Sequence, residues 1–260
     1  MGVVNVTPDS FSDGGRFLDR DAAIAHGLVL FAQGADVVDV GGESTRPGAE
    51  PVPEAEELAR VVPVVEELAR HGKVSVDTRK PAVAEAAVAA GATLVNDVSA
   101  SADLWQVAAN AGAGYVAMHM QGTPGTMQQA PRYDDVVGEV RAFLVERATA
   151  ARDAGVDEVW IDPGIGFGKT AEHNLSLLKH LGALVDTGFP VVVGTSRKRF
   201  LQGLIGAGPD DVLEGTIATC VAAMQAGARM VRVHDVRPAV ESARLVGPAE
   251  LGQSQQGARA

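Results

Sequence analysis

Short apolar runs alternate along this chain with longer segments in which apolar residues recur at helical spacing. The short runs are rich in valine and isoleucine, which favour strands. We predict strands at residues 3–4, 36–40, 73–76, 93–95, 115–118, 159–161, 190–193 and 230–233. We predict one helix after each strand, at residues 20–33, 53–70, 80–90, 104–111, 135–154, 171–181, 211–225 and 236–246.

Strands that alternate with helices predict a parallel sheet, and eight such units predict a single-domain (β/α)8 TIM barrel over residues 1–247. A Gly-Ala pair stands between helix and strand at 34–35, 91–92, 112–113 and 227–228, where glycine suits a helix end. An open doubly wound sheet is the alternative. Pro63 should kink or split the second helix. Residues 248–260 are rich in Gln, Ser, Gly and Ala, and we expect a disordered tail.

Polar residues follow every predicted strand. Barrel enzymes carry their chemistry on the loops at these strand ends, so the pattern predicts one pocket. The residues are Asn5, Glu43 to Arg46, Asp77, Asn96 with Asp97, His119, Asp162, Ser196 to Lys198, and Arg232 with His234. The segment from Asn5 to Gly15 is longer than most connections. We interpret it as a mobile active-site loop hinged on Asn5, with an ordinary surface loop as the alternative.

The composition of the chain excludes several classes of function. The chain has 260 residues, 46% of them apolar, and a net charge of −11, which argues against binding to nucleic acid or to anionic lipid. No apolar run is long enough to span a bilayer, and no signal peptide is visible. The single cysteine, Cys220, lies in an apolar helical pattern. It indicates a buried thiol and a cytoplasmic protein.

The residues at the strand ends form two chemical sets. One set is cationic and suits phosphate: Arg46, Arg197, Lys198, Arg232 and His234. The other is Asp77, Asn96 and Asp162, whose carboxylates and amide suit a flat heterocycle with amino and amide groups. The alternative is that the two sets form ion pairs with each other inside the protein.

Two familiar site patterns are absent from the sequence. Residues 164–170, GIGFGKT, resemble a phosphate-binding loop, but Pro163 stands where the Walker pattern needs glycine, and Lys169 stands where the dinucleotide pattern needs it. The six histidines show no paired metal spacing, which argues against a structural zinc.

Several motifs, in order along nearly the whole chain, resemble those of the bacterial dihydropteroate synthases, a pterin-binding TIM-barrel family. They are residues 5–15, 39–48 (DVGGESTRPG), 75–78 (SVDT), 96–98 (NDV), 118–124 (MHMQGTP), 162–164 (DPG), 196–200 (SRKRF) and 232–235 (RVHD). The resemblance implies a transferase of folate biosynthesis. It would condense 6-hydroxymethyl-7,8-dihydropterin pyrophosphate with 4-aminobenzoate to give 7,8-dihydropteroate and pyrophosphate. Sulfonamide drugs imitate the 4-aminobenzoate.

The resemblance also implies roles for single residues. Asp77, Asp162, Lys198, Asn5 and Arg232 would be catalytic. The pterin would contact Asp77, Asn96, Met118, Asp162, Gly194 and Lys198. The pyrophosphate would contact Asn5, Arg46, Arg232 and His234, and Asn5 would hold Mg²⁺. The aminobenzoate would contact Thr45, Pro47, Phe167, Ser196 and Lys198.

Family members are typically homodimers, and we expect the same here, with small-molecule substrates and neither nucleic acid nor membrane as a partner. Two other functions remain open at this stage. One is a pterin-dependent methyltransferase, which would not need residues 196–198 or the first loop. The other is a catalytically silent pterin-binding paralogue, which would be expected to have lost Asn5, Thr45 and Arg46.

Overall fold

The strands pair in the order in which they occur along the chain. The computed structural model describes residues 1–6, 16–45, 48–206, 208 and 212–246. Six strands form one parallel sheet: β1 (Gly2–Asn5), β2 (Val37–Gly41), β3 (Lys73–Asp77), β4 (Leu94–Asp97), β5 (Gly114–Met118) and β6 (Val159–Asp162). The short strands β7 (Val192–Val193) and β8 (Met230–Val231) form a separate parallel pair.

Backbone contacts join this pair to both edges of the six-stranded sheet. Ile161 of β6 bridges Val191, and the Ile161 N–H donates to the carbonyl of Pro190 at 3.0 Å. On the other side Gly2 bridges Val233, and the N–H of Val3 donates to the Val233 carbonyl at 3.0 Å. The ring is therefore closed. The predicted (β/α)8 barrel is confirmed, and the open doubly wound alternative is wrong.

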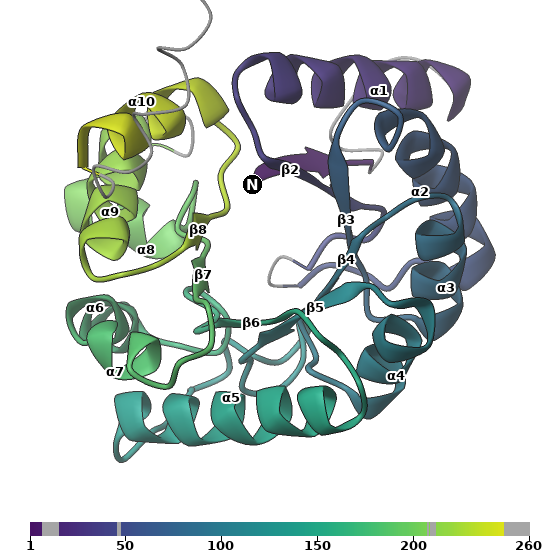
Figure 1. Cartoon of the computed structure of the whole chain (residues 1–260). Helices are drawn as coiled ribbons and strands as arrows, with labels where there is room; N and C mark the ends of the chain where they lie inside the picture. Colours follow the sequence, from purple (N-terminus) through teal and green to yellow (C-terminus); the bar gives the residue numbers. More distant parts are fainter. Residues whose placement is uncertain (7–15, 46–47, 207, 209–211, 247–260) are drawn as a thin grey trace, which may run out of the picture.

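Helices surround the strands (Figure 1). They are α1 (Arg16–Ala32), α2 (Glu54–Leu68), α3 (Pro81–Ala89), α4 (Ala102–Ala111), α5 (Val136–Asp153), α6 (Ala171–Lys179), α7 (Gly182–Val185), α8 (Arg199–Ile205), α9 (Leu213–Gln225) and α10 (Val236–Val246). The eight predicted helices are present, and the short helices α7 and α8 are additional. None of the helices in the described ranges is long and apolar enough to cross a membrane.

The second helix is not split by its proline. Helix α2 continues from Glu54 to Leu68 with Pro63 inside it, so of the two expected effects, a kink or a split, the split is wrong. Val61, Val64, Val65 and Leu68 around this position are all fully buried. Their packing outweighs the backbone hydrogen bond that a proline removes from a helix.

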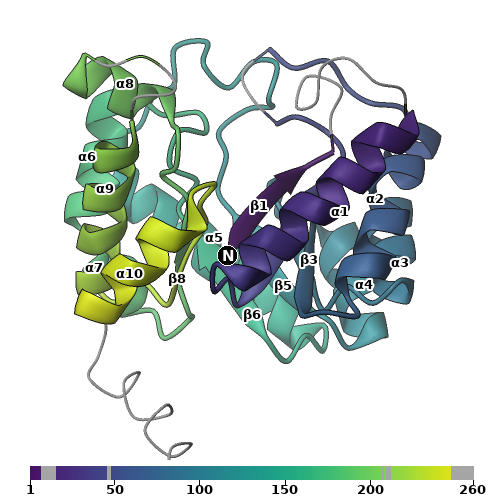
Figure 2. The ribbon, with the colours of Figure 1, turned by 90° about the horizontal axis from the view of Figure 1, so that it is seen from above.

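Side chains alternate along each strand between the helices and the barrel interior. On β3, Val74 and Val76 pack into the large core between strands and helices, which leaves Ser75 and Asp77 on the inner side. The inner side has its own small apolar cluster: Met1, Val37, Leu94, Val116 and Val192, with Trp160 and Met230 packed against it. Figure 2 shows the long loops gathered at one end of the barrel, the end to which the β1 arrow points.

Candidate active site

One pocket lies at the C-terminal ends of the strands. It brings together most of the predicted site residues: Thr45, Asp77, Asn96, Met118, Asp162, Phe167, Gly194, Lys198 and Arg232. Val98, Gly164 and Ile165 complete the lining. The prediction that the strand ends converge on one pocket is confirmed for these residues.

A two-residue period explains why these side chains meet. Leu94, Val116, Trp160, Val192 and Met230 form the apolar cluster inside the barrel. The pocket residue on each of these strands comes two positions later, in the order Asn96, Met118, Asp162, Gly194 and Arg232. Because residues two apart share a face of a strand, the apolar cluster becomes the floor of the pocket and these five residues form part of its wall.

Arg232 is held by two acids from neighbouring strands. Its Nε donates to Asp39 Oδ2 at 2.6 Å, and its Nη2 donates to Asp77 Oδ2 at 2.8 Å. Burial alone would lower the pKa of Arg232, but Asp39 and Asp77 raise it above its ordinary value. The guanidinium is therefore permanently charged and fixed in the pocket. The cationic and acidic sets are in contact here, as the alternative interpretation expected, and both still line the pocket.

Asp39 also fixes the orientation of Asn96. The Asn96 Nδ2 donates to Asp39 Oδ2 at 2.9 Å. A carboxylate only accepts hydrogen bonds, so the amide nitrogen must face Asp39. The side-chain oxygen of Asn96 is then left to accept a hydrogen bond from a ligand in the pocket.

Asp77 also presents a hydrogen-bond acceptor to the pocket. Its Oδ1 is buried and, within the described part of the chain, has no hydrogen-bond partner. Burial raises the pKa of Asp77 above its ordinary value, while the charge of Arg232 opposes that shift. An N–H donor from a ligand would satisfy this oxygen and stabilise the ionised form.

Asp162 ends β6 and begins a tight loop. Its Oδ1 accepts the Gly164 N–H at 2.7 Å. Burial raises the pKa of Asp162, and the bond from Gly164 together with the nearby charges of Lys198 and Arg232 opposes the shift. The second carboxylate oxygen completes a row of acceptors along the ends of β3, β4 and β6. Such a row matches the amino and ring N–H groups of an aminopyrimidine edge.

The glycine-rich stretch after Asp162 surrounds a buried lysine instead of a phosphate. Lys169 is only 3% exposed, and its Nζ donates to the carbonyls of Gly164 and Phe167 at 3.0 Å and of His119 at 3.2 Å. Its Nζ also lies 2.9 Å from Nδ1 of His119. Burial lowers the pKa of Lys169 to about 7. We call Lys169 with these carbonyls and the His119 ring the lysine cage.

Glycine is required where the loop passes closest to the β5 end. Gly164 has φ +64°, and a Cβ there would lie 1.9 Å from the carbonyl oxygen of His119. Gly168 has φ +60°, and a Cβ there would lie 2.4 Å from the carbonyl oxygen of Gln121. Both positions therefore exclude larger residues on two grounds, backbone conformation and space.

Phe167 and Lys198 face each other across the pocket. The Lys198 Nζ lies 4.0 Å from the centre of the Phe167 ring, a cation–π contact. This places an aromatic face and a positive charge beside one another. A flat arylamine with a carboxylate could stack on the first and pair with the second.

Some predicted residues lie beside the pocket. The Ser196 Oγ lies 3.0 Å from Nδ1 of His234 and accepts the His234 backbone N–H at 3.2 Å. Asn5 is half-buried at the end of β1, and pairs in register with Gly41, which pairs with Asp77. Arg46, Pro47 and the loop predicted at 7–15 lie outside the described residues, as does the predicted tail.

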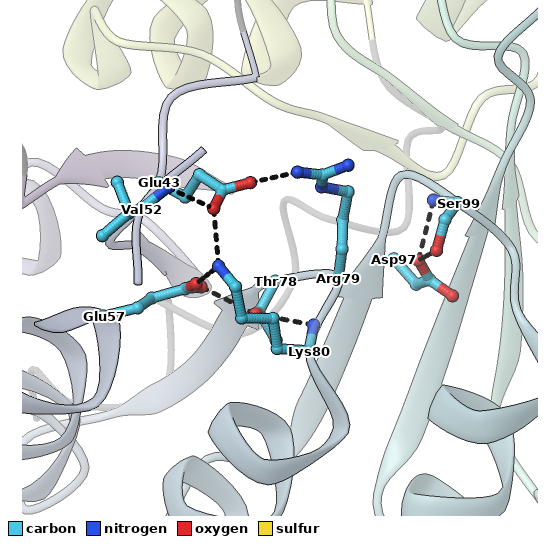
Figure 3. Close-up of polar contacts among 8 residues, drawn as sticks. All are labelled: Glu43, Val52, Glu57, Thr78, Arg79, Lys80, Asp97 and Ser99. Atoms are coloured by element: carbon cyan, nitrogen blue, oxygen red, sulfur yellow. Dashed lines mark hydrogen bonds and ion pairs between the residues drawn. The ribbon is translucent and has the colours of Figure 1, made fainter. Parts of the chain in front are cut away.

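Three strand-end residues serve other purposes, so the prediction that all of them line the pocket is wrong. His119 belongs to the lysine cage, and burial lowers its pKa to about 3. Asp97 accepts the N–H and hydroxyl of Ser99 (Figure 3). It also accepts the hydroxyl of Tyr115. Arg197 forms an ion pair with Asp235 at 3.1 Å.

The comparisons with known proteins agree with this geometry. The sequence pattern of the pterin binding enzymes matches residues 1–234. The chain belongs to the pterin-binding enzyme family. Dihydropteroate synthase of Mycobacterium leprae is 49% identical to it over 261 residues, which cover 95% of this chain and 92% of that protein.

Solved structures of this pterin-binding family are equally close. Xanthomonas albilineans dihydropteroate synthase with 4-aminobenzoic acid is 50% identical, with a TM-score of 0.88, and the match covers 94% of this chain and 90% of that one. Yersinia pestis dihydropteroate synthase with a sulfonamide drug is 43% identical, with a TM-score of 0.89 and coverage of 95% and 92%. At this similarity the activity of the chain is that of a dihydropteroate synthase, a transferase.

Two residues that shape this pterin-family pocket escaped the sequence analysis. Asp39 lies inside β2, between Val38 and Val40. Lys169 lies in the glycine-rich stretch 164–170, which does not match the phosphate-binding patterns. A single acid in an otherwise apolar strand was the available signal for Asp39. For Lys169 the sequence held no comparable signal, because its partners are backbone carbonyls. Across the described residues, no group of three or more His, Cys, Asp or Glu could hold a metal ion.

Proposed function

We propose that this pocket binds the pterin pyrophosphate with its ring against Asp77, Asn96 and Asp162 and joins it to 4-aminobenzoate. The observation that carries the proposal is the row of acceptor oxygens at the ends of β3, β4 and β6 in one pocket. Met118 and Gly194 form the wall beside the ring, and Lys198 reaches its edge. A Cβ on Gly194 would lie 3.7 Å from Arg232, so the protein itself does not require glycine there. The ligand would use that space.

The pyrophosphate lies, in this proposal, at the ends of β1 and β8. Arg232 supplies a fixed positive charge, and His234 is positioned by its bond to Ser196. Arg46, which lies outside the described residues, is assigned to the pyrophosphate by the family resemblance alone. The Asn5 amide oxygen is a ligand type that Mg²⁺ accepts, and its place on the rim beside Gly41 and Asp77 fits a metal shared with the pyrophosphate. Bound Mg²⁺ would neutralise charge on the leaving pyrophosphate.

In the proposal the 4-aminobenzoate lies between Thr45 and Phe167, with Ser196 and Lys198 nearby. Pro47, outside the described residues, is assigned to it by the family resemblance alone. Thr45, Phe167 and Lys198 line the pocket together. The X. albilineans relative was solved with 4-aminobenzoic acid and the Y. pestis relative with a sulfonamide drug. Those ligands support an arylamine site of this kind here.

The reaction needs no protein nucleophile. The C–O bond between the pterin methylene and the pyrophosphate breaks, and its electron pair leaves with the pyrophosphate. The amine nitrogen of 4-aminobenzoate forms the new C–N bond and loses a proton to solvent. Asp77 and Asp162 stabilise the positive charge that develops on the pterin, while Arg232 stabilises the departing oxygen.

We further propose a cytoplasmic homodimer whose barrel domain covers residues 1–247. Leu204 and Ile205 of α8 are each 50% exposed, and Leu213 of α9 is 38% exposed. Exposed apolar residues on adjacent helices favour a protein contact. The buried free thiol of Cys220 suits a reducing compartment. Sedimentation velocity on the purified chain tests the dimer.

The experiment for the function measures pyrophosphate release from the pterin pyrophosphate, with and without 4-aminobenzoate and Mg²⁺. We expect release that depends on both, with 7,8-dihydropteroate as the second product. Asp162→Ala should abolish pterin binding in a direct titration, because it removes an acceptor from the row. Pterin binding without release would instead identify a silent paralogue. Unchanged pterin affinity in the variant would overturn the role given to Asp162.

A further inference from the structure

The loop between β2 and α2 is closed at its base by one side chain. Glu43, just after β2, accepts the backbone N–H of Val52 on its Oε2 at 3.0 Å. Thr45, which lines the pocket, lies inside the segment that this bond closes. Arg46 and Pro47 belong to the same segment in sequence. The bond therefore brings the two ends of a substrate-contacting loop together.

The same carboxylate ties the loop base to the end of β3. Its Oε1 accepts from Arg79 and its Oε2 accepts from Lys80 Nζ at 2.5 Å. Arg79 and Lys80 follow Asp77 with only Thr78 between. Figure 3 shows Glu43 between the ends of these two basic side chains. The pterin acceptor Asp77 and the loop that carries Thr45 thus share one ionic connection.

Helix α2 completes the connection. Lys80 Nζ also donates to Glu57, and the Thr78 hydroxyl donates to Glu57 Oε1 at 2.7 Å. The side chains of Glu57 and Glu43 are 1% and 6% exposed. Two buried acids and two bases give a network with no net charge, which is what buried ions require. Hydrogen bonds from Lys80 and Arg79 lower the pKa of Glu43, although burial alone would raise it.

A second observation shows that the start of the loop is fixed. Gly42 lies so close to α2 that a Cβ would be 2.7 Å from Val61 and 3.0 Å from Glu57. Its carbonyl accepts from Arg60 of the same helix at 2.9 Å. The backbone before Glu43 is therefore held against α2, and Glu43 sets the direction in which the loop leaves the barrel.

We propose that Glu43 is a positioning residue for the 4-aminobenzoate site. Through Arg79, Lys80 and Val52 it sets the distance between the Thr45 segment and the pterin pocket. This inference rests on the proposed function. It assigns Glu43 no contact with either substrate, so its loss should affect the second substrate more than the first.

Steady-state kinetics of Glu43→Gln test the proposal. Glutamine keeps an oxygen for the Val52 N–H and loses the charge that holds Arg79 and Lys80. We expect the KM for 4-aminobenzoate to rise about ten- to hundredfold, because small misplacements of a binding group have effects of that order. Affinity for the pterin pyrophosphate, measured by direct titration, should stay within twofold. Glu66→Gln, an exposed residue paired with Arg70, is the matched control and should change neither.

The double variant Glu43→Gln/Arg79→Leu separates positioning from stability. It also removes the Arg79 charge that Glu43→Gln leaves unpaired, so its thermal midpoint should return toward that of the parent. The KM for 4-aminobenzoate should stay high. A KM that returns to the parent value would overturn the proposal, as would an unchanged KM in Glu43→Gln. If the parent forms no dihydropteroate, the proposed function fails instead, and the parent control reports that separately.

Discussion

The two loops that carry the residues of the proposed arylamine site are anchored by opposite means. The loop after β6 is held by a buried base, Lys169, which donates to backbone carbonyls. The loop after β2 is held by a nearly buried acid, Glu43, which pairs with two basic side chains. The first anchor fixes the path of the backbone within the loop. The second fixes only the base of its loop and leaves the segment beyond it to its own contacts.

The comparison predicts different tolerance to an added methyl group. Gly164→Ala in the β6 loop meets the His119 carbonyl at 1.9 Å, so we expect a loss of about 2–5 kcal/mol in the free energy of unfolding. Gly48→Ala in the β2 loop has φ +81° but nothing within 4 Å, and should lose only about 1 kcal/mol. Denaturant unfolding of both variants measures this. Equal losses would show that the two loops are equally constrained.

The lysine cage predicts a loss of activity that involves both substrates. Lys169→Met fills similar space but donates to none of the three carbonyls, so Gly164 beneath Asp162 and Phe167 beside Lys198 lose their support. We expect kcat/KM to fall about a hundredfold for the pterin and for 4-aminobenzoate alike. In Glu43→Gln only the arylamine should be affected. The same substrate pattern in both variants would contradict the distinction between the loops.

The two anchors should respond to opposite ends of the pH range. Because Lys169 has a pKa lowered to about 7 from its ordinary value of 10.5, the unfolded chain binds the extra proton between these values. Stability of the parent relative to Lys169→Met should therefore rise with pH above about 7, by about 1.4 kcal/mol per pH unit.

Glu43 behaves in the other direction. Its pKa is lowered in the folded protein, so its contribution to stability is present above its ordinary pKa and is lost as the pH falls through the lowered value. The stability difference between the parent and Glu43→Gln should shrink in acid. Unfolding curves for both pairs from about pH 2 to pH 9, a range that includes the acid side of the ordinary carboxylate pKa, measure the two trends. A flat difference across that range for either pair would disprove its anchor.

The sequence predicted the fold because apolar residues form short, valine-rich runs in the strands and recur at helical spacing in the helices. It predicted most of the pocket because a polar residue followed each strand. It failed where the partner of a side chain was a backbone group or a distant acid. Neither the carbonyls around Lys169 nor the hydrogen bond from Asn96 to Asp39 can be read from the spacing of residues in the sequence. Asp97 and His119 directly follow the pocket residues Asn96 and Met118. Because successive side chains of a strand alternate faces, both point away from the pocket, and the period of two could have excluded them.

The way Lys169 holds its loop has an evolutionary consequence. The cage recognises the carbonyls of Gly164 and Phe167, which every amino acid possesses, and makes no demand on the Phe167 side chain. The side chain proposed to meet the arylamine could therefore be replaced without altering the backbone path of the loop. Contact with a ligand and support of the loop are in this way carried by different atoms of a single short segment.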